Sequence, residues 1–117
     1  MIKKLLTASL LLLVLQSHNA QAHEDHTHET ISPNSALSIA RDVVEQFSNV
    51  DPGLGFGQLN VTWKELSKDS SKIEVEGQGY YVVSVKNDAE QKTLYVLIST
   101  TGDVYDANFT GEFPKLN

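Results

Sequence analysis

The chain contains no cysteine, which excludes disulfide bridges, thiolate metal ligands and the lipid attachment of a bacterial lipoprotein. Its only methionine is Met1, so no soft sulfur ligand for copper(I) remains beyond the first residue. Basic side chains are also scarce: nine Lys and Arg stand against fifteen Asp and Glu in 117 residues, a formal charge of −6. This acidic balance disfavours nucleic acid and anionic membrane surfaces as partners and favours cations.

The longest apolar run is short and lies at the start of the chain. Leu5 to Leu15 follows the cations Lys3 and Lys4 and is followed by the small-x-small sequence Ala20-Gln21-Ala22. These are the three parts of a cleavable secretory signal peptide. About 11 residues are too few for the roughly 20 of a membrane-spanning helix, so we expect export without membrane insertion after cleavage. The short signal is typical of bacteria, and the periplasm is the expected location.

We predict three parts in the chain: residues 1–22 are the signal peptide, 23–30 a disordered His-rich tail, and 31–117 a single α+β domain. Cleavage would leave 95 residues and, because Lys3 and Lys4 are lost, a formal charge of −8. The stretch His23 to Glu29 has no hydrophobic residue to bury, which is typical of a tail.

A helix is predicted directly after the tail. Ser32 can cap free backbone N–H groups, and Pro33 is tolerated at the first helical position. Apolar residues then recur at spacings of three and four: Ala36, Leu37, Ala40, Val43, Val44 and Phe47. This period indicates an amphipathic helix of about four turns. Asp51-Pro52-Gly53 ends the region, and Gly53 to Gly57 is predicted to be a loop.

From Asn60 onward the apolar period is two, which predicts strands. We expect strands at Val61 with Trp63, at Lys72 to Glu76, around Tyr81 to Val85, at Thr93 to Ser99 with both faces buried, and at Val104 to Phe109. Residues 87–92 form a predicted hairpin connection, and 101–103 a tight turn. One helix followed by a meander of strands predicts an α+β fold, with the N-terminal amphipathic helix packed on an antiparallel sheet of about four strands.

Three segments near the end of the chain carry a resemblance: Thr93-Leu94-Tyr95-Val96, Thr101-Gly102 and Ala107-Asn108-Phe109-Thr110-Gly111. With the signal peptide, the His-rich N-terminus and the helix, the chain resembles the PepSY-like group of small exported bacterial domains. It is particularly similar to an uncharacterised periplasmic family within that group. The resemblance implies a helix on an antiparallel sheet and a loose association with peptidase inhibition, and it does not fix a function.

The tail carries the residues best suited to binding a ligand. After cleavage His23 would have a free α-amine, and this amine and its imidazole can chelate one metal ion. His26 and His28 can add nitrogen ligands, and Glu24 and Asp25 can add oxygen ligands. Imidazole nitrogen suits copper(II) and zinc, so we predict a divalent metal site at these five residues and no organic cofactor. The alternative is a solvated tail in which the histidines are incidental.

An enzyme is not predicted, because after cleavage no Cys is present and no His lies outside the tail. The usual hydrolase triads therefore cannot be assembled in the domain. Glu74 and Glu76 are expected to share the solvated face of one strand. The glycines at 53, 55 and 57 do not match the dinucleotide fingerprint, since Gln58 follows.

Aromatic side chains on strands of a small domain usually build or cover its core. We expect this of Trp63, Tyr80, Tyr81, Tyr95 and Tyr105. Asn108 and Thr110 are expected to make turn hydrogen bonds at the end of the sheet.

Two functions remain open from the sequence. The first is a non-enzymatic periplasmic protein that binds a divalent ion through its tail, with a periplasmic protein partner such as an efflux component. The second is a PepSY-like interaction or peptidase-inhibitor module that holds a peptide or protein at its sheet edge or aromatic face. In this second case the tail is incidental.

Overall fold

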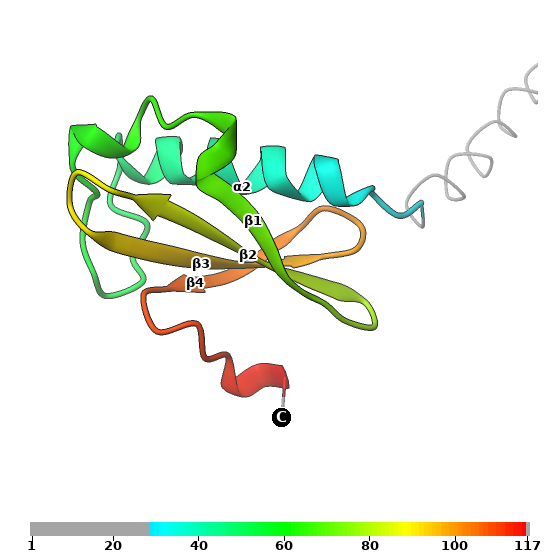
Figure 1. The fold of residues 1–117 in the computed structure, drawn as a ribbon. Helices are drawn as coiled ribbons and strands as arrows, with labels where there is room; N and C mark the ends of the chain where they lie inside the picture. Colours follow the sequence, from blue (N-terminus) through cyan, green and yellow to red (C-terminus); the bar gives the residue numbers. More distant parts are fainter. Residues whose placement is uncertain (1–28, 117) are drawn as a thin grey trace, which may run out of the picture.

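The computed structural model describes residues 29–116. Figure 1 shows one α-helix followed by a four-stranded sheet. The elements are α2 (Pro33–Phe47), β1 (Ser71–Glu76), β2 (Tyr80–Asn87), β3 (Lys92–Ser99) and β4 (Val104–Asn108), with 3-10 helices at Val61–Trp63, Lys68–Ser70 and Pro114–Leu116. The predicted signal peptide and residues 23–28 of the predicted tail lie outside the described residues.

Helix α2 begins and ends where local hydrogen bonds satisfy its terminal backbone groups. The Ser32 hydroxyl accepts a hydrogen bond from the Ser35 N–H at 3.1 Å, and Pro33 occupies the first helical position. At the other end the backbone N–H of Ser48 donates to the Val44 carbonyl, and its hydroxyl donates to the Glu45 carbonyl. Such capping satisfies groups that the helix itself leaves unpaired. The predicted helix is confirmed.

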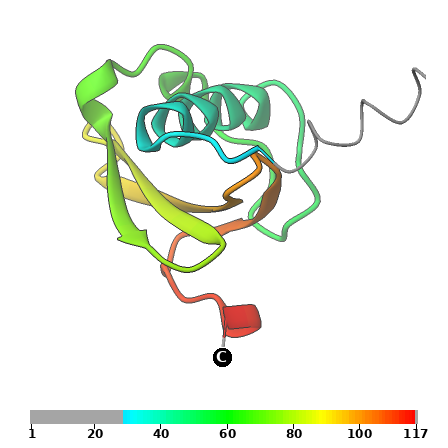
Figure 2. The same cartoon turned by 90° about the vertical axis from the view of Figure 1, so that its right-hand side faces the viewer.

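The sheet is an antiparallel meander in the order β1-β2-β3-β4, so each strand pairs with its neighbour in sequence. Helix α2 lies across one face, and the segment after β4 lies on the other side, as the turned view in Figure 2 shows. Between helix and sheet lies the main core of fully buried residues: Ala36, Ala40, Val44, Leu59, Trp63, Tyr81, Val83, Val85, Leu94, Val96, Ile98 and Ala107. This arrangement confirms the predicted α+β fold class.

Strand β3 is buried on both faces, as predicted. Val96 and Ile98 point into the core beneath the helix, whereas Leu97 lies on the outer face and is 1% exposed. Leu97 is covered by Phe113, which follows the last strand and packs on Leu97 and Val82. Burying a leucine side chain stabilises a fold by about 1.5–3 kcal/mol, so the C-terminal segment contributes to the stability of the sheet.

The prediction of a strand at Val61 and Trp63 is wrong, because these residues form a 3-10 helix. The Asn60 side chain accepts a hydrogen bond from the Thr62 N–H at 2.9 Å and starts the turn. The Trp63 N–H then donates to the Asn60 carbonyl at 3.0 Å. Val61 consequently points to solvent while Trp63 is buried, and the spacing of two does not reflect a shared strand face.

A β-bulge in β1 separates residues that the alternating pattern placed together. Ile73 lies opposite Val83, but Val75 lies opposite Val82. Consecutive residues of β2 point to opposite faces, so Ile73 packs beneath the helix and Val75 lies on the outer face.

The same bulge makes the predicted common face of Glu74 and Glu76 wrong. Glu74 accepts a hydrogen bond from the Ser84 hydroxyl at 2.8 Å on the outer face. Glu76 lies opposite Tyr81, whose ring belongs to the core on the other face. The two carboxylates do not form a pair.

Candidate functional site

The five predicted metal ligands lie outside the described residues. His23, Glu24, Asp25, His26 and His28 all precede residue 29, where the described structure begins. The metal site therefore stays a prediction from the sequence. The structure does define where this segment joins the fold.

The junction is held by Ile31, whose backbone groups are both hydrogen-bonded. Its N–H donates to the Thr100 carbonyl at 2.7 Å, and its carbonyl accepts from the Tyr81 hydroxyl at 3.2 Å. A Cβ at Gly102 would lie 3.6 Å from the Ile31 side chain, so the β3–β4 turn packs closely against this residue. The chain thus enters the fold at a fixed point, three residues after His28.

Two exposed carboxylates flank this entry point. Glu29 precedes Ile31 in the chain, and Asp103 lies in the β3–β4 turn that packs on it. The Asp103 N–H donates to the Ser99 hydroxyl at 3.0 Å, which fixes the backbone of the turn. Within residues 29–116, no three His, Cys, Asp or Glu side chains gather in a group that could hold a metal ion. The described part thus contributes separate carboxylates at this end.

The predicted aromatic residues divide between the two faces of the sheet. Trp63 and Tyr81 are buried in the core beneath the helix, as expected. Tyr80 and Tyr95 are half-buried and pack on the outer-face cluster that contains Phe113. Tyr105 is 54% exposed, so the expectation that it belongs to the core is wrong. It lies at a bulge of β4, where Leu97 pairs with Asp106 and Ile98 with Val104.

An open groove of about 380 Å³ runs along the outer face beside the C-terminal segment. Its lining comes from β1, β2 and the end of the chain: Val75, Tyr80, Val82, Gly111, Glu112, Phe113, Pro114 and Leu116. Val75 is 42% exposed. Such a groove can receive apolar side chains of a peptide.

A polar network around Glu90 joins the turn at Trp63 to the β2–β3 hairpin. The Trp63 indole N–H donates to one Glu90 oxygen at 3.1 Å, and the Thr62 hydroxyl donates to the other at 3.1 Å. The Asn87 side chain, 1% exposed, donates to the Thr62 hydroxyl at 3.0 Å. Sequence reasoning missed this network. The signal that could have indicated it is Asn60 two residues before Thr62, an arrangement typical of a side-chain-capped turn.

The glycine-containing loop is structural, as predicted. Gly55 has φ +102°, a conformation that other residues rarely adopt. The loop carries Phe56 onto the rings of Phe47 and Phe109, with centroid distances of 6.1 and 5.2 Å. These contacts close the end of the core.

The end of β4 makes the turn hydrogen bonds expected of Asn108 and Thr110. The Asn108 side-chain oxygen accepts from the N–H groups of Thr110 and Gly111, at 3.2 and 2.7 Å. Its amide nitrogen donates to the Glu112 carbonyl at 2.8 Å. This turn directs the chain back beneath the sheet, toward the position of Phe113.

The fold and these surfaces define a small α+β protein with one helix on a four-stranded meander. A family model described as "Family of unknown function (DUF6488)" matches residues 1–112, and the chain belongs to this family. No curated protein and no solved structure matches the chain. Within residues 29–116, no helix has the length and apolar character needed to cross a membrane.

Proposed function

We propose that this protein is an exported, non-enzymatic protein of the bacterial periplasm that binds one divalent ion, copper(II) or zinc, at its N-terminus. His23, His26 and His28 supply imidazole nitrogens, and Glu24 and Asp25 supply oxygens. Removal of residues 1–22 creates the free α-amine of His23, which closes a chelate ring with its own imidazole.

The observation that carries this proposal is the distribution of histidine. Three of the four histidines in the chain fall within six consecutive residues directly after the small-x-small sequence at 20–22. An α-amine and three imidazoles amount to four nitrogen ligands on a short segment, a set that suits copper(II) and zinc. The hydrogen bonds of Ile31 to Thr100 and Tyr81 support a role in which the fold holds the base of this segment.

The charge of the entry point supports a cation as the ligand. Glu29 and Asp103 are exposed beside Ile31, and the chain without residues 1–22 has a formal charge of −8. Negative charge close to a site raises the local concentration of cations and lowers the cost of holding one. The folded part then serves as the base from which the bound ion is passed to a protein partner.

Calorimetric titration of copper(II) and zinc tests this proposal. The protein beginning at His23 should bind one ion. One extra residue before His23 should weaken binding at least tenfold, because the α-amine moves away from the imidazole. Replacing both His26 and His28 with Asn should weaken it further, whereas the matched change Asn34→His, on the surface of α2, should leave it unchanged. Equal affinity in all four proteins would contradict the proposal.

A second candidate is a PepSY-like interaction or inhibitor module, supported by the outer-face groove. Val75, Tyr80 and Leu116 expose apolar surface along it. In this case the groove binds a peptide and the tail is incidental. A peptide library panned against the wild type and the Val75→Asp variant would distinguish the candidates, because selective loss of peptides by the variant favours the module.

A further inference from the structure

The one arginine of the chain has no carboxylate partner among residues 29–116. Arg41 is half-buried on α2, and its guanidinium donates to the Ser71 hydroxyl at 2.9 Å. That hydroxyl in turn donates to the Lys68 carbonyl at 3.3 Å. The ion pairs among the described side chains are Lys72 with Glu74 and Lys86 with Asp88. In so acidic a protein, a half-buried arginine that has no acidic partner in the described part of the chain is unusual.

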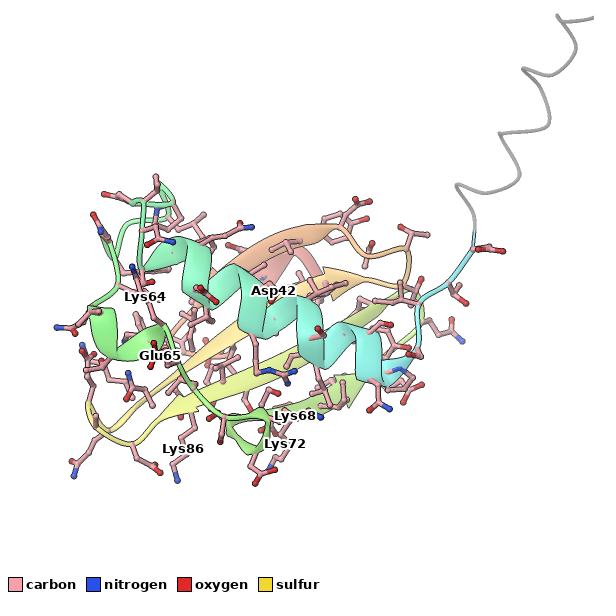
Figure 3. All side chains as sticks on the ribbon, turned by 90° about the horizontal axis from the view of Figure 1, so that it is seen from above. Asp42, Lys64, Glu65, Lys68, Lys72 and Lys86 are labelled. Carbon is pink, nitrogen blue, oxygen red and sulfur yellow. The ribbon has the colours of Figure 1, made fainter. Side chains whose placement is uncertain are left out.

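The guanidinium borders a groove of about 470 Å³ between α2 and the 3-10 helix Lys68–Ser70. The residues that line it are Asn34, Leu37, Ser38, Arg41 and Lys68. They provide two cations, an amide and a hydroxyl, and no carboxylate. Lys72 and Lys86, which Figure 3 also labels, line a separate hollow with Glu74 and Ser84 on the outer face of the sheet.

The carboxylates nearest to these two cations in sequence are absent from the lining of this groove. Asp42 and Glu45 line a smaller cavity of about 110 Å³, which Arg41 also borders, together with Lys64 and Trp63. Asp69, next to Lys68 in the chain, lines the separate hollow on the outer face. Neither Asp42 nor Glu45 forms an ion pair with Arg41 within 4 Å among the described residues. The larger groove therefore presents positive charge and hydrogen-bond donors on a protein whose overall charge is negative.

We propose that this groove, formed by Arg41, Lys68, Asn34 and Ser38, is a binding site for an oxyanion, a carboxylate or a phosphate group. Arginine has five N–H donors in a planar fork that fits two oxygens of such a group. The bond to Ser71 uses one donor and fixes the side chain at the groove. Lys68 adds a second charge, and Asn34 and Ser38 add polar groups. The site is independent of the metal-binding proposal.

The test is an NMR titration of the isotope-labelled protein, beginning at His23, with inorganic phosphate at constant ionic strength. Arg41 is the only arginine, so its side-chain Nε–H gives a single, unambiguous signal. This signal and the amide signals of Asn34, Ser38 and Lys68 should shift and saturate together. An Arg41 signal that does not move would overturn the proposal.

Variants separate a local site from general electrostatics. Arg41→Gln and Lys68→Gln should each lower phosphate affinity at least fivefold. Lys86→Gln removes the same charge from the outer face of the sheet, outside the groove, and should change affinity less than twofold. Lys68 is exposed, so its replacement tests the site even if Arg41→Gln disturbs folding. Equal losses for Lys68→Gln and Lys86→Gln would overturn the proposal.

Discussion

Replacing Glu90 with alanine should lower the free energy of unfolding, because the change removes both acceptor oxygens of one polar network. Glu90 accepts one hydrogen bond from the Trp63 indole and one from the Thr62 hydroxyl. The indole belongs to a side chain that is 1% exposed, so water cannot readily take the place of the lost acceptor. A buried donor left without a partner costs more than the bond alone contributed.

The magnitude follows from the number of bonds and the exposure. A hydrogen bond to a charged group contributes about 1.5–3 kcal/mol, and Glu90 is half-buried, which favours the lower end. Two such bonds give a loss of about 3 kcal/mol for Glu90→Ala. Glu90→Gln keeps one oxygen acceptor and should lose about 1 kcal/mol. These are large fractions of a typical domain stability of about 5–15 kcal/mol.

The assay is urea unfolding followed by the fluorescence of Trp63, the single tryptophan. The matched control is Asp88→Ala, which removes the same type of charge from the same hairpin. The Asp88 side chain is 87% exposed and pairs with Lys86, and such surface pairs contribute about 0–1 kcal/mol. If Glu90→Ala and Asp88→Ala lower the free energy of unfolding equally, the network does not stabilise the fold.

Three further predictions concern the helix start, the last turn and the metal. Ser32→Ala removes the helix cap and should lower the unfolding free energy by about 1 kcal/mol in urea titrations, whereas Ser32→Asp should not. Gly111 has φ +78°, and an added Cβ would lie 3.3 Å from the Tyr95 ring, so Gly111→Ala should cost about 1–2 kcal/mol. A lower melting temperature would show it, and an unchanged one would refute the argument. Protonated imidazole cannot coordinate, so copper(II) affinity should fall as pH drops through about 6.5 if His26 and His28 are ligands. Constant affinity down to pH ~5 would exclude them.

The helix and all four strands could be predicted from local patterns, and the one strand predicted in error is that at Val61 and Trp63. Ser32 and Pro33 mark the start of α2, and the apolar spacing behind them sets its buried face. In β2 and β3 the alternation extends over enough residues to indicate a strand by itself. At Val61 and Trp63 the pattern comprised only two residues, and the Asn60 side chain determined the local structure.

The remaining errors depend on tertiary pairing. The bulge that separates Glu74 from Glu76 exists because β1 must pair with β2, and no local spacing in β1 signals an extra residue. The covering of Leu97 by Phe113 depends on the direction in which the chain leaves β4. Neither the partner strand nor this direction can be read from a single segment.

The two candidate sites also differ in whether they could be predicted from the sequence. The His-rich segment is visible in the sequence because its residues are consecutive. The groove at Arg41 and Lys68 is not, since 27 positions separate the two residues. They meet because the 3-10 helix that precedes β1 packs beside α2. The net negative charge of the chain predicted cationic partners and gave no indication of the local positive charge at this groove.

The bulges in β1 and β4 have a consequence for behaviour at high concentration. These strands form the two edges of the sheet, and each has a register shift within it. A regular unpaired edge is a template on which another chain can add and begin a fibril, and bulges interrupt that template. Both edges are interrupted here, so copies can join edge to edge only over short stretches. The two bulges thus reduce the tendency of this protein, which has no disulfides to stabilise it, to aggregate through its sheet edges.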